Sequence, residues 1–127
     1  GELQFLEVYL TNANAPTGFK LTLFNDTVAE TDSVVDLAGE PVGNGYSRQT
    51  VERSSTGWTS IALSGGDYEA TSKIVQFTAT GAWTVVNKIG LITVHITPKL
   101  LAYADLSTSY TLASGQALQA NMKIKAA

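Results

Sequence analysis

Cysteine is absent from this chain of 127 residues, and charged residues are scarce. Without cysteine the chain has no disulfide, no thiol nucleophile and no metal site of the cysteine type. Only 15% of the residues are charged and the net charge is −3, so the chain lacks the basic surface that binds nucleic acids or anionic membranes. No apolar run reaches the ~18 residues of a membrane-spanning helix, and no signal-peptide pattern is visible. We therefore expect neither nucleic acid nor a membrane as a partner.

Groups for catalysis are equally scarce. His95 is the only histidine and lies within an apolar strand pattern, where a lone histidine is typically structural. The Gly-x-Ser-x-Gly pattern of a serine nucleophile is absent. Asp67, Glu69 and Asp105 could supply paired carboxylates, but nothing in their spacing brings them together. We therefore predict that the protein is not an enzyme and has no cofactor.

Short runs of alternating apolar residues, separated by turns rich in Gly, Asn and Ser, recur along the chain. They predict about eight strands in an all-β fold, a two-sheet β-sandwich with jelly-roll strand order as one option. With 44% hydrophobic residues the chain can form one core, so residues 1–127 are expected to be a single domain. The last run, 117–126, has Lys123 and Lys125 on its polar face, as is typical of a protected edge strand. Its other face is apolar and consists of Leu118, Ala120, Met122 and Ile124.

Residues 73–96 contain two apolar runs on either side of a Thr-Gly-Ala turn. Phe77 lies in the first run, and Trp83 begins the second. This pattern predicts a hairpin at the centre of the sandwich. The two aromatic side chains are expected in the core, although an aromatic platform for a ligand is an alternative.

Residues 1–13 predict the one helix of the chain, because leucines recur at positions 3, 6 and 10. Further apolar residues between them widen the stripe beyond what one packing face usually needs. Two interpretations stay open: a helix that caps one end of the sandwich, and a helix or arm that packs on another subunit. The second makes these residues candidates for partner contact: Leu3, Phe5, Leu6, Val8 and Tyr9.

Residues 25–45 form a long polar connection with five of the eleven acidic residues. A loop of about twenty residues is unusual in a small domain and is often functional or ordered by a partner. The acids do not have the spacing of an EF-hand calcium loop, so the pattern favours a solvated or partner-facing loop over a metal site. An arginine follows in the next strand, either as a contact group or simply exposed. The candidates for partner contact here are Asp32, Asp36, Glu40, Tyr46 and Arg48.

Four short motifs resemble the layout of small virion proteins of tailed phages. After the expected helix, residues 21–24 match a Leu-x-Leu-Phe strand, and after the acidic loop residues 45–49 match Gly-Tyr-x-Arg-Gln. Residues 75–83 match Ile-x-Phe-x-Ala-x-Gly-x-Trp, with Val75 in place of Ile. Residues 114–118 match a Ser-Gly-x-x-Leu turn into the last strand. Together the motifs span nearly the whole chain in order.

The resemblance implies a non-enzymatic structural protein of a phage particle, made in the host cytoplasm. The first expectation is a capsid decoration (cement) protein on the capsid surface that binds the major capsid protein and stabilises the head. Such a protein is expected to be a homo-oligomer, with a trimer favoured. The alternative is a tail-tip or fibre-associated module that binds a host surface glycan. The low charge, the wide apolar stripe and the acidic loop all suit a surface that partners cover.

Overall fold

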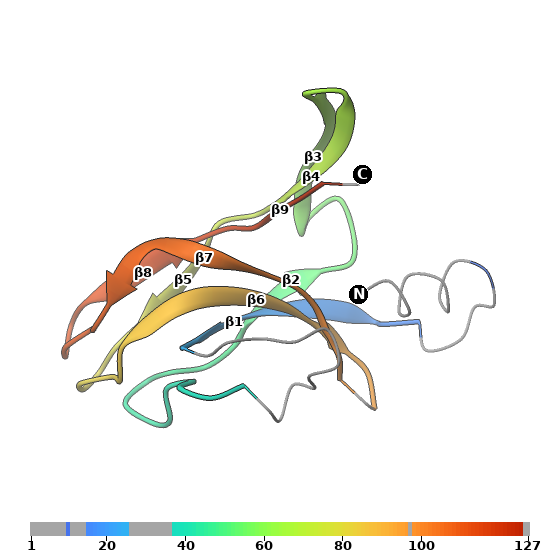
Figure 1. Ribbon diagram of the computed structural model, residues 1–127. Helices are drawn as coiled ribbons and strands as arrows, with labels where there is room; N and C mark the ends of the chain where they lie inside the picture. The colour runs from blue at the N-terminus through green and yellow to red at the C-terminus, as the bar shows by residue number, and fades with distance from the viewer. Residues whose placement is uncertain (1–9, 11–14, 26–36, 97, 126–127) are drawn as a thin grey trace.

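The computed structural model of the protein describes residues 10, 15–25, 37–96 and 98–125 (Figure 1). These residues form nine strands and confirm the predicted all-β fold class. In chain order the strands are β1 (Gly18–Phe24), β2 (Gln49–Glu52), β3 (Trp58–Ser64), β4 (Asp67–Ser72), β5 (Val75–Thr78), β6 (Val86–Val94), β7 (Leu100–Tyr110), β8 (Ala117–Ala120) and β9 (Lys123–Lys125).

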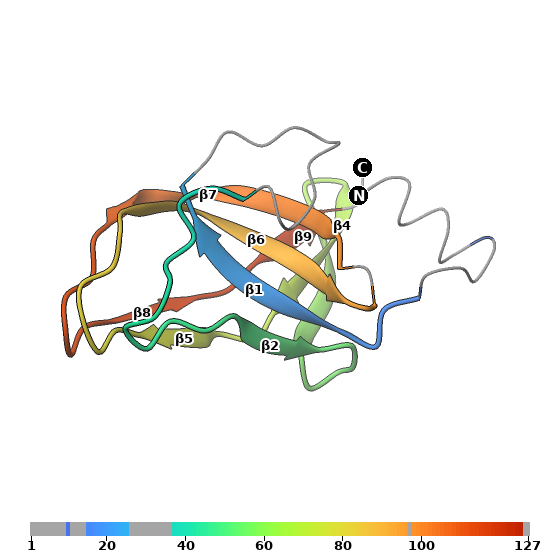
Figure 2. The same ribbon diagram turned by 90° about the horizontal axis from the view of Figure 1, so that it is seen from below.

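The nine strands form three sheets, and every pairing between neighbouring strands is antiparallel. One sheet has four strands in the order β2-β1-β6-β7, and β5 pairs with β8 opposite it (Figure 2). The third sheet has the order β3-β4-β9, and its β3–β4 hairpin rises away from the layered body at one end (Figure 1). The jelly-roll option for the strand order stays a prediction.

The hydrophobic core lies between the four-stranded sheet and the β5–β8 pair. Leu21 and Leu23 of β1 and Leu91 of β6 are fully buried, and Phe77 of β5 is only 1% exposed. Consecutive residues of β1 and β6 are buried, so both faces of these two strands are covered, which explains why their apolar runs are nearly continuous instead of alternating. Sequence pattern and burial agree here.

The predicted hairpin over residues 73–96 is wrong. β5 pairs with β8, while β6 pairs with β1 and β7, so the two apolar runs belong to different sheets. The segment between them crosses from one layer to the other, and Trp83 donates its backbone N–H to Leu112 O at 2.9 Å. Alternation identifies a strand from its own residues, but pairing is decided by the strands that arrive from elsewhere in the chain.

The last apolar run is interrupted. Its two halves, β8 and β9, join different sheets and are separated by Asn121 and Met122. The predicted inward face is nevertheless confirmed, because Met122 is buried in the core and Leu118, Ala120 and Ile124 pack against it. β9 is an edge strand of its sheet and has Lys123 and Lys125, as predicted.

The predicted N-terminal helix lies outside the described residues, apart from Leu10, whose side chain is exposed. Its two interpretations, cap or intersubunit arm, therefore stay predictions.

Candidate functional site

Three predicted contact residues, Glu40, Tyr46 and Arg48, lie together beside β1. Arg48 grips the Glu40 carboxylate with two hydrogen bonds, from Nη2 to Oε1 at 2.7 Å and from Nε to Oε2 at 2.8 Å. The Tyr46 hydroxyl donates to Glu40 Oε2 at 2.7 Å, and the Thr22 hydroxyl donates to the same oxygen at 2.5 Å. Such a bidentate arginine–carboxylate pair is stronger and more directional than a single hydrogen bond.

The electrostatics of this polar cluster indicate a closed network. Burial alone would raise the pKa of the Glu40 carboxyl, but the hydrogen bonds from Arg48, Thr22 and Tyr46 outweigh burial and hold it below 4.5. Burial raises the pKa of the Tyr46 hydroxyl, so this phenol stays neutral and remains a donor. The hydrogen bond with Glu40 raises the pKa of Arg48. The cluster is thus an ionised Glu40–Arg48 pair to which the Thr22 and Tyr46 hydroxyls are hydrogen-bonded.

The polar cluster ties one end of the acidic loop to the four-stranded sheet. Leu37 is buried, and Asn25 donates its backbone N–H to Ala38 O at 3.1 Å, so the chain returns close to the end of β1. Gly39 has a φ of +73°, and a Cβ there would lie 2.8 Å from Asn25 Cβ. The arrangement gives Glu40 and Arg48 a partner within the chain. Their contact with another protein stays a prediction.

The remaining predicted contact residues lie outside the described part of the chain: Leu3, Phe5, Leu6, Val8, Tyr9, Asp32 and Asp36.

The described residues contain neither a cluster of metal ligands nor a membrane-spanning helix. No group of three or more His, Asp or Glu side chains within them could hold a metal ion. The candidate carboxylate Asp105 forms an ion pair with Lys88. No helix in the described part of the chain is both long and apolar enough to cross a membrane.

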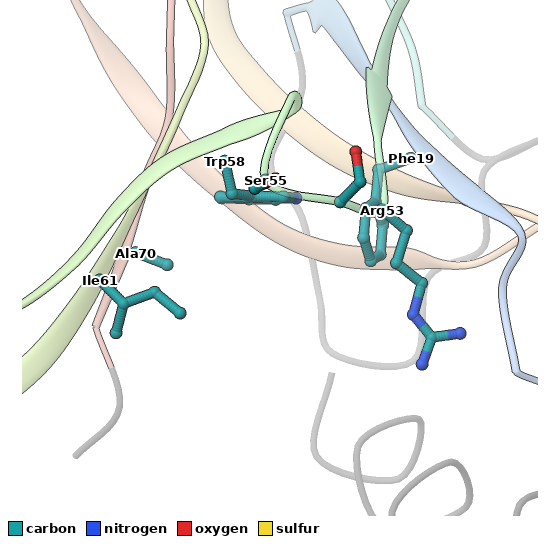
Figure 3. Close-up of a pocket in the computed structure, with 7 residues that line it drawn as sticks. Phe19, Arg53, Ser55, Trp58, Ile61 and Ala70 are labelled. Carbon is teal, nitrogen blue, oxygen red and sulfur yellow. The ribbon is translucent and has the colours of Figure 1, made fainter.

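An apolar groove that no sequence motif indicated lies between β1 and the β3–β4 hairpin (Figure 3). It is open to solvent and has a volume of about 440 Å³. Trp58 lies between Phe19 and Arg53 on one side and Ile61 and Ala70 on the other. The rings of Phe19 and Trp58 meet edge to face, with centroids 5.9 Å apart. We call this feature the β1–β3 groove.

The β3–β4 hairpin continues the groove as an exposed apolar surface. Cross-strand pairing puts Ile61 beside Ala70 and Leu63 beside Tyr68 on one face. Ile124 of β9 pairs with Ala70 and extends this row into the core. The exposed fractions are 75% for Ile61, 64% for Leu63 and 63% for Tyr68. We call this surface the hairpin face.

The sequence contained a signal for the hairpin face, namely the alternation of Ile61 and Leu63 before the Gly65-Gly66 turn. Alternation predicts a strand with one buried face, but it does not say whether the core or another molecule buries that face. Sequence alone therefore could not reveal that this strand extends beyond the core.

An all-β fold with a stabilised loop, an apolar groove and an uncovered sheet face is typical of proteins that act through surface contacts. Comparison with known families identifies which class this is. A family model described as "Podophage GP4 fiber I protein gp80" matches residues 2–124. The chain therefore belongs to this family of podophage fibre proteins. No curated protein matches the chain.

The family confirms the predicted phage virion structural protein at this coarser level, because a fibre is part of the phage particle. Its description names a fibre and does not mention a capsid decoration.

Proposed function

We propose that the protein is a non-enzymatic structural component of a podophage fibre that assembles from several copies of this chain, with a trimer favoured. The observation that carries the proposal is the fibre-protein family match over residues 2–124, nearly the full chain. The fibre-associated alternative from the sequence thus becomes the preferred one. Recognition of a host surface glycan by such a fibre stays a prediction.

The geometry supports a structural role. Within the described part of the chain, the titratable groups with shifted pKa values are Glu40, Tyr46 and Arg48, and they bond to one another beside β1. Their bonds stabilise a loop, and the pair with Arg48 leaves the Glu40 carboxylate engaged instead of poised for proton transfer. A continuous uncovered apolar area lies instead on the β1–β3 groove and the hairpin face. Apolar area of this kind suits association with protein.

Location and copy number in the particle test the proposal. Antibody raised against the recombinant chain, detected with gold in electron micrographs of intact phage, is expected to label fibres. Quantitative gel analysis of purified particles is expected to give a few tens of copies or fewer. Gold spread over the head, together with hundreds of copies, would overturn the proposal in favour of a decoration protein bound to the major capsid protein.

A further inference from the structure

The β3–β4 hairpin is apolar on one side, the hairpin face, and polar on the other. Its opposite side presents Glu69 beside Lys125 and Thr71 beside Lys123. The apolar side has the residues that would face a core, yet Ile61, Leu63 and Tyr68 are each at least 63% exposed. Three such side chains expose roughly 400 Å², which is in the range of the largest apolar patch on a typical monomer and is often functional.

The edge of the same sheet is also unprotected. β3 (Trp58–Ser64) is an edge strand among the described strands, and its seven residues include neither a charge nor a proline. At the other edge, β9 has two lysines in three residues. Natural edge strands that stay unpaired are usually short, charged or interrupted. This contrast indicates that the β3 side of the sheet is made for contact and the β9 side is not.

We propose that this surface joins copies of the chain: Leu63 and Tyr68 at the hairpin tip of one copy dock in the β1–β3 groove of a neighbouring copy. The inference rests on the proposed function, because it names the surface through which the copies of the fibre component meet. Each copy has both halves of the contact, an apolar tip and an apolar groove walled by Phe19, Trp58 and Ile61. Successive copies can then close into a ring.

Charge favours an identical copy as the occupant. Two copies each have a net charge of −3, so they associate most readily through surfaces without acidic groups. The hairpin face has no charged residue, and the one charged side chain at the groove is Arg53. Arg53 is held in place because Nη1 donates to Pro16 O at 2.8 Å, and its guanidinium can meet the ring of an incoming Tyr68.

The side chains of the tip suit a protein partner better than a sugar or a phosphate. Tyr68 has a single hydroxyl and Leu63 has no polar side-chain group, so the tip has few hydrogen-bonding groups for sugar hydroxyls and no positive charge for phosphates. The area also fits a protein contact. The exposed apolar side chains supply about half of the roughly 800 Å² that each partner of a stable interface buries, and in a ring every copy makes two such contacts, one with its tip and one with its groove.

Size-exclusion chromatography with light scattering on the full chain tests the inference. The unmodified protein is expected to be an oligomer at micromolar concentration. Replacing Ile61 and Leu63 with Ser together should weaken self-association at least tenfold while the circular-dichroism spectrum stays unchanged, because both side chains are mostly exposed. Val42→Ser and Ile96→Ser are matched controls, since these side chains are exposed on connections outside the hairpin, and both should remain oligomeric.

Cross-linking tests the geometry, and the absence of native cysteine removes background reaction. Leu63→Cys mixed with Ser55→Cys should give disulfide-linked pairs under mild oxidation, because Ser55 lies at the groove. Leu63→Cys mixed with Val42→Cys should give none.

Three outcomes would overturn the inference: a monomeric unmodified protein, an oligomer that the Ile61 and Leu63 double variant leaves intact, and efficient linkage of Leu63→Cys to itself. A monomer that nevertheless labels fibres would leave the fibre location in the proposed function standing and would remove its assembly from several copies. Gold labelling of the head would remove the proposed function whatever the oligomeric state.

Discussion

At the scale of single residues, Trp83 links parts of the chain that lie far apart in sequence. Its side chain is only 5% exposed, and its Nε1–H donates to Asn44 O at 2.8 Å. Its ring meets Tyr46 edge to face, with centroids 5.3 Å apart, and Tyr46 in turn stacks on Phe77. The expected core position of Trp83 is therefore confirmed, although its predicted hairpin is not.

Trp83→Ala is expected to lower the free energy of unfolding by about 3–5 kcal/mol, because it removes a large buried side chain and leaves a cavity. Chemical denaturation followed by circular dichroism measures this. Val42→Ala is the control, since Val42 is 92% exposed and should change stability by less than about 0.5 kcal/mol. A loss below about 1 kcal/mol for Trp83→Ala would contradict the packing described here.

Glu40→Gln is expected to lower the free energy of unfolding at pH 7 by about 1–3 kcal/mol, because a charged partner of Arg48 is lost from a partly buried network. The pH dependence has a definite sign. Since the folded state holds the pKa of Glu40 below 4.5, its contribution is complete above that pH and disappears as the pH falls through the lower, folded value.

The unmodified protein should therefore lose stability below pH 4.5 more steeply than Glu40→Gln does, in denaturant melts at several pH values. Glu52→Gln is the matched control, because Glu52 is an exposed glutamate at the end of β2. If the two variants behaved alike across the pH series, the polar cluster would not be a stabilising element.

At the scale of elements, the turn between β2 and β3 positions the hairpin that forms one wall of the β1–β3 groove. Gly57 is buried in this turn, donates its N–H to Ser54 O at 3.1 Å and accepts the Lys73 N–H at 2.7 Å. A Cβ on Gly57 would lie 2.0 Å from Glu52 O, so the backbone approaches too closely for any side chain. The start of β3 depends on this close approach.

Gly57→Ala is expected to destabilise the protein by about 1–3 kcal/mol, because β2 and the turn must move apart to accept the methyl group. Thermal denaturation provides the measurement. Gly18→Ala in β1 is the matched control, since the nearest atom to its added Cβ is 4.0 Å away. Equal melting temperatures for the two variants would contradict the close packing at Gly57.

At the scale of the whole molecule, the layered body and the protruding hairpin have different roles. The buried cluster joins β1, β2, β5 and β6 with Leu112 and Met122 between the layers. The hairpin adds a sheet beyond this body (Figure 1), and Ile61, Leu63 and Tyr68 on its apolar face are mostly exposed. Folding is thus expected to depend on the body, and assembly on the periphery.

Deletion of residues 1–13 is expected to leave a cooperative β-type melt but to weaken assembly, because the wide apolar stripe of this segment suits contact with another subunit. Circular dichroism and light scattering on the truncated chain measure the two effects separately. Loss of the cooperative melt would mean that the segment belongs to the core.

The sequence by itself determined the strand-rich class and the inward face of the last run. These follow from alternation and residue type, which are local properties of the chain. Only the tertiary structure decided that β5 pairs with β8, that Arg48 grips Glu40, and that Ile61 and Leu63 extend past the core. The physical reason is that pairing and burial depend on which distant segments lie beside a strand, and the residues of the strand alone do not specify those segments.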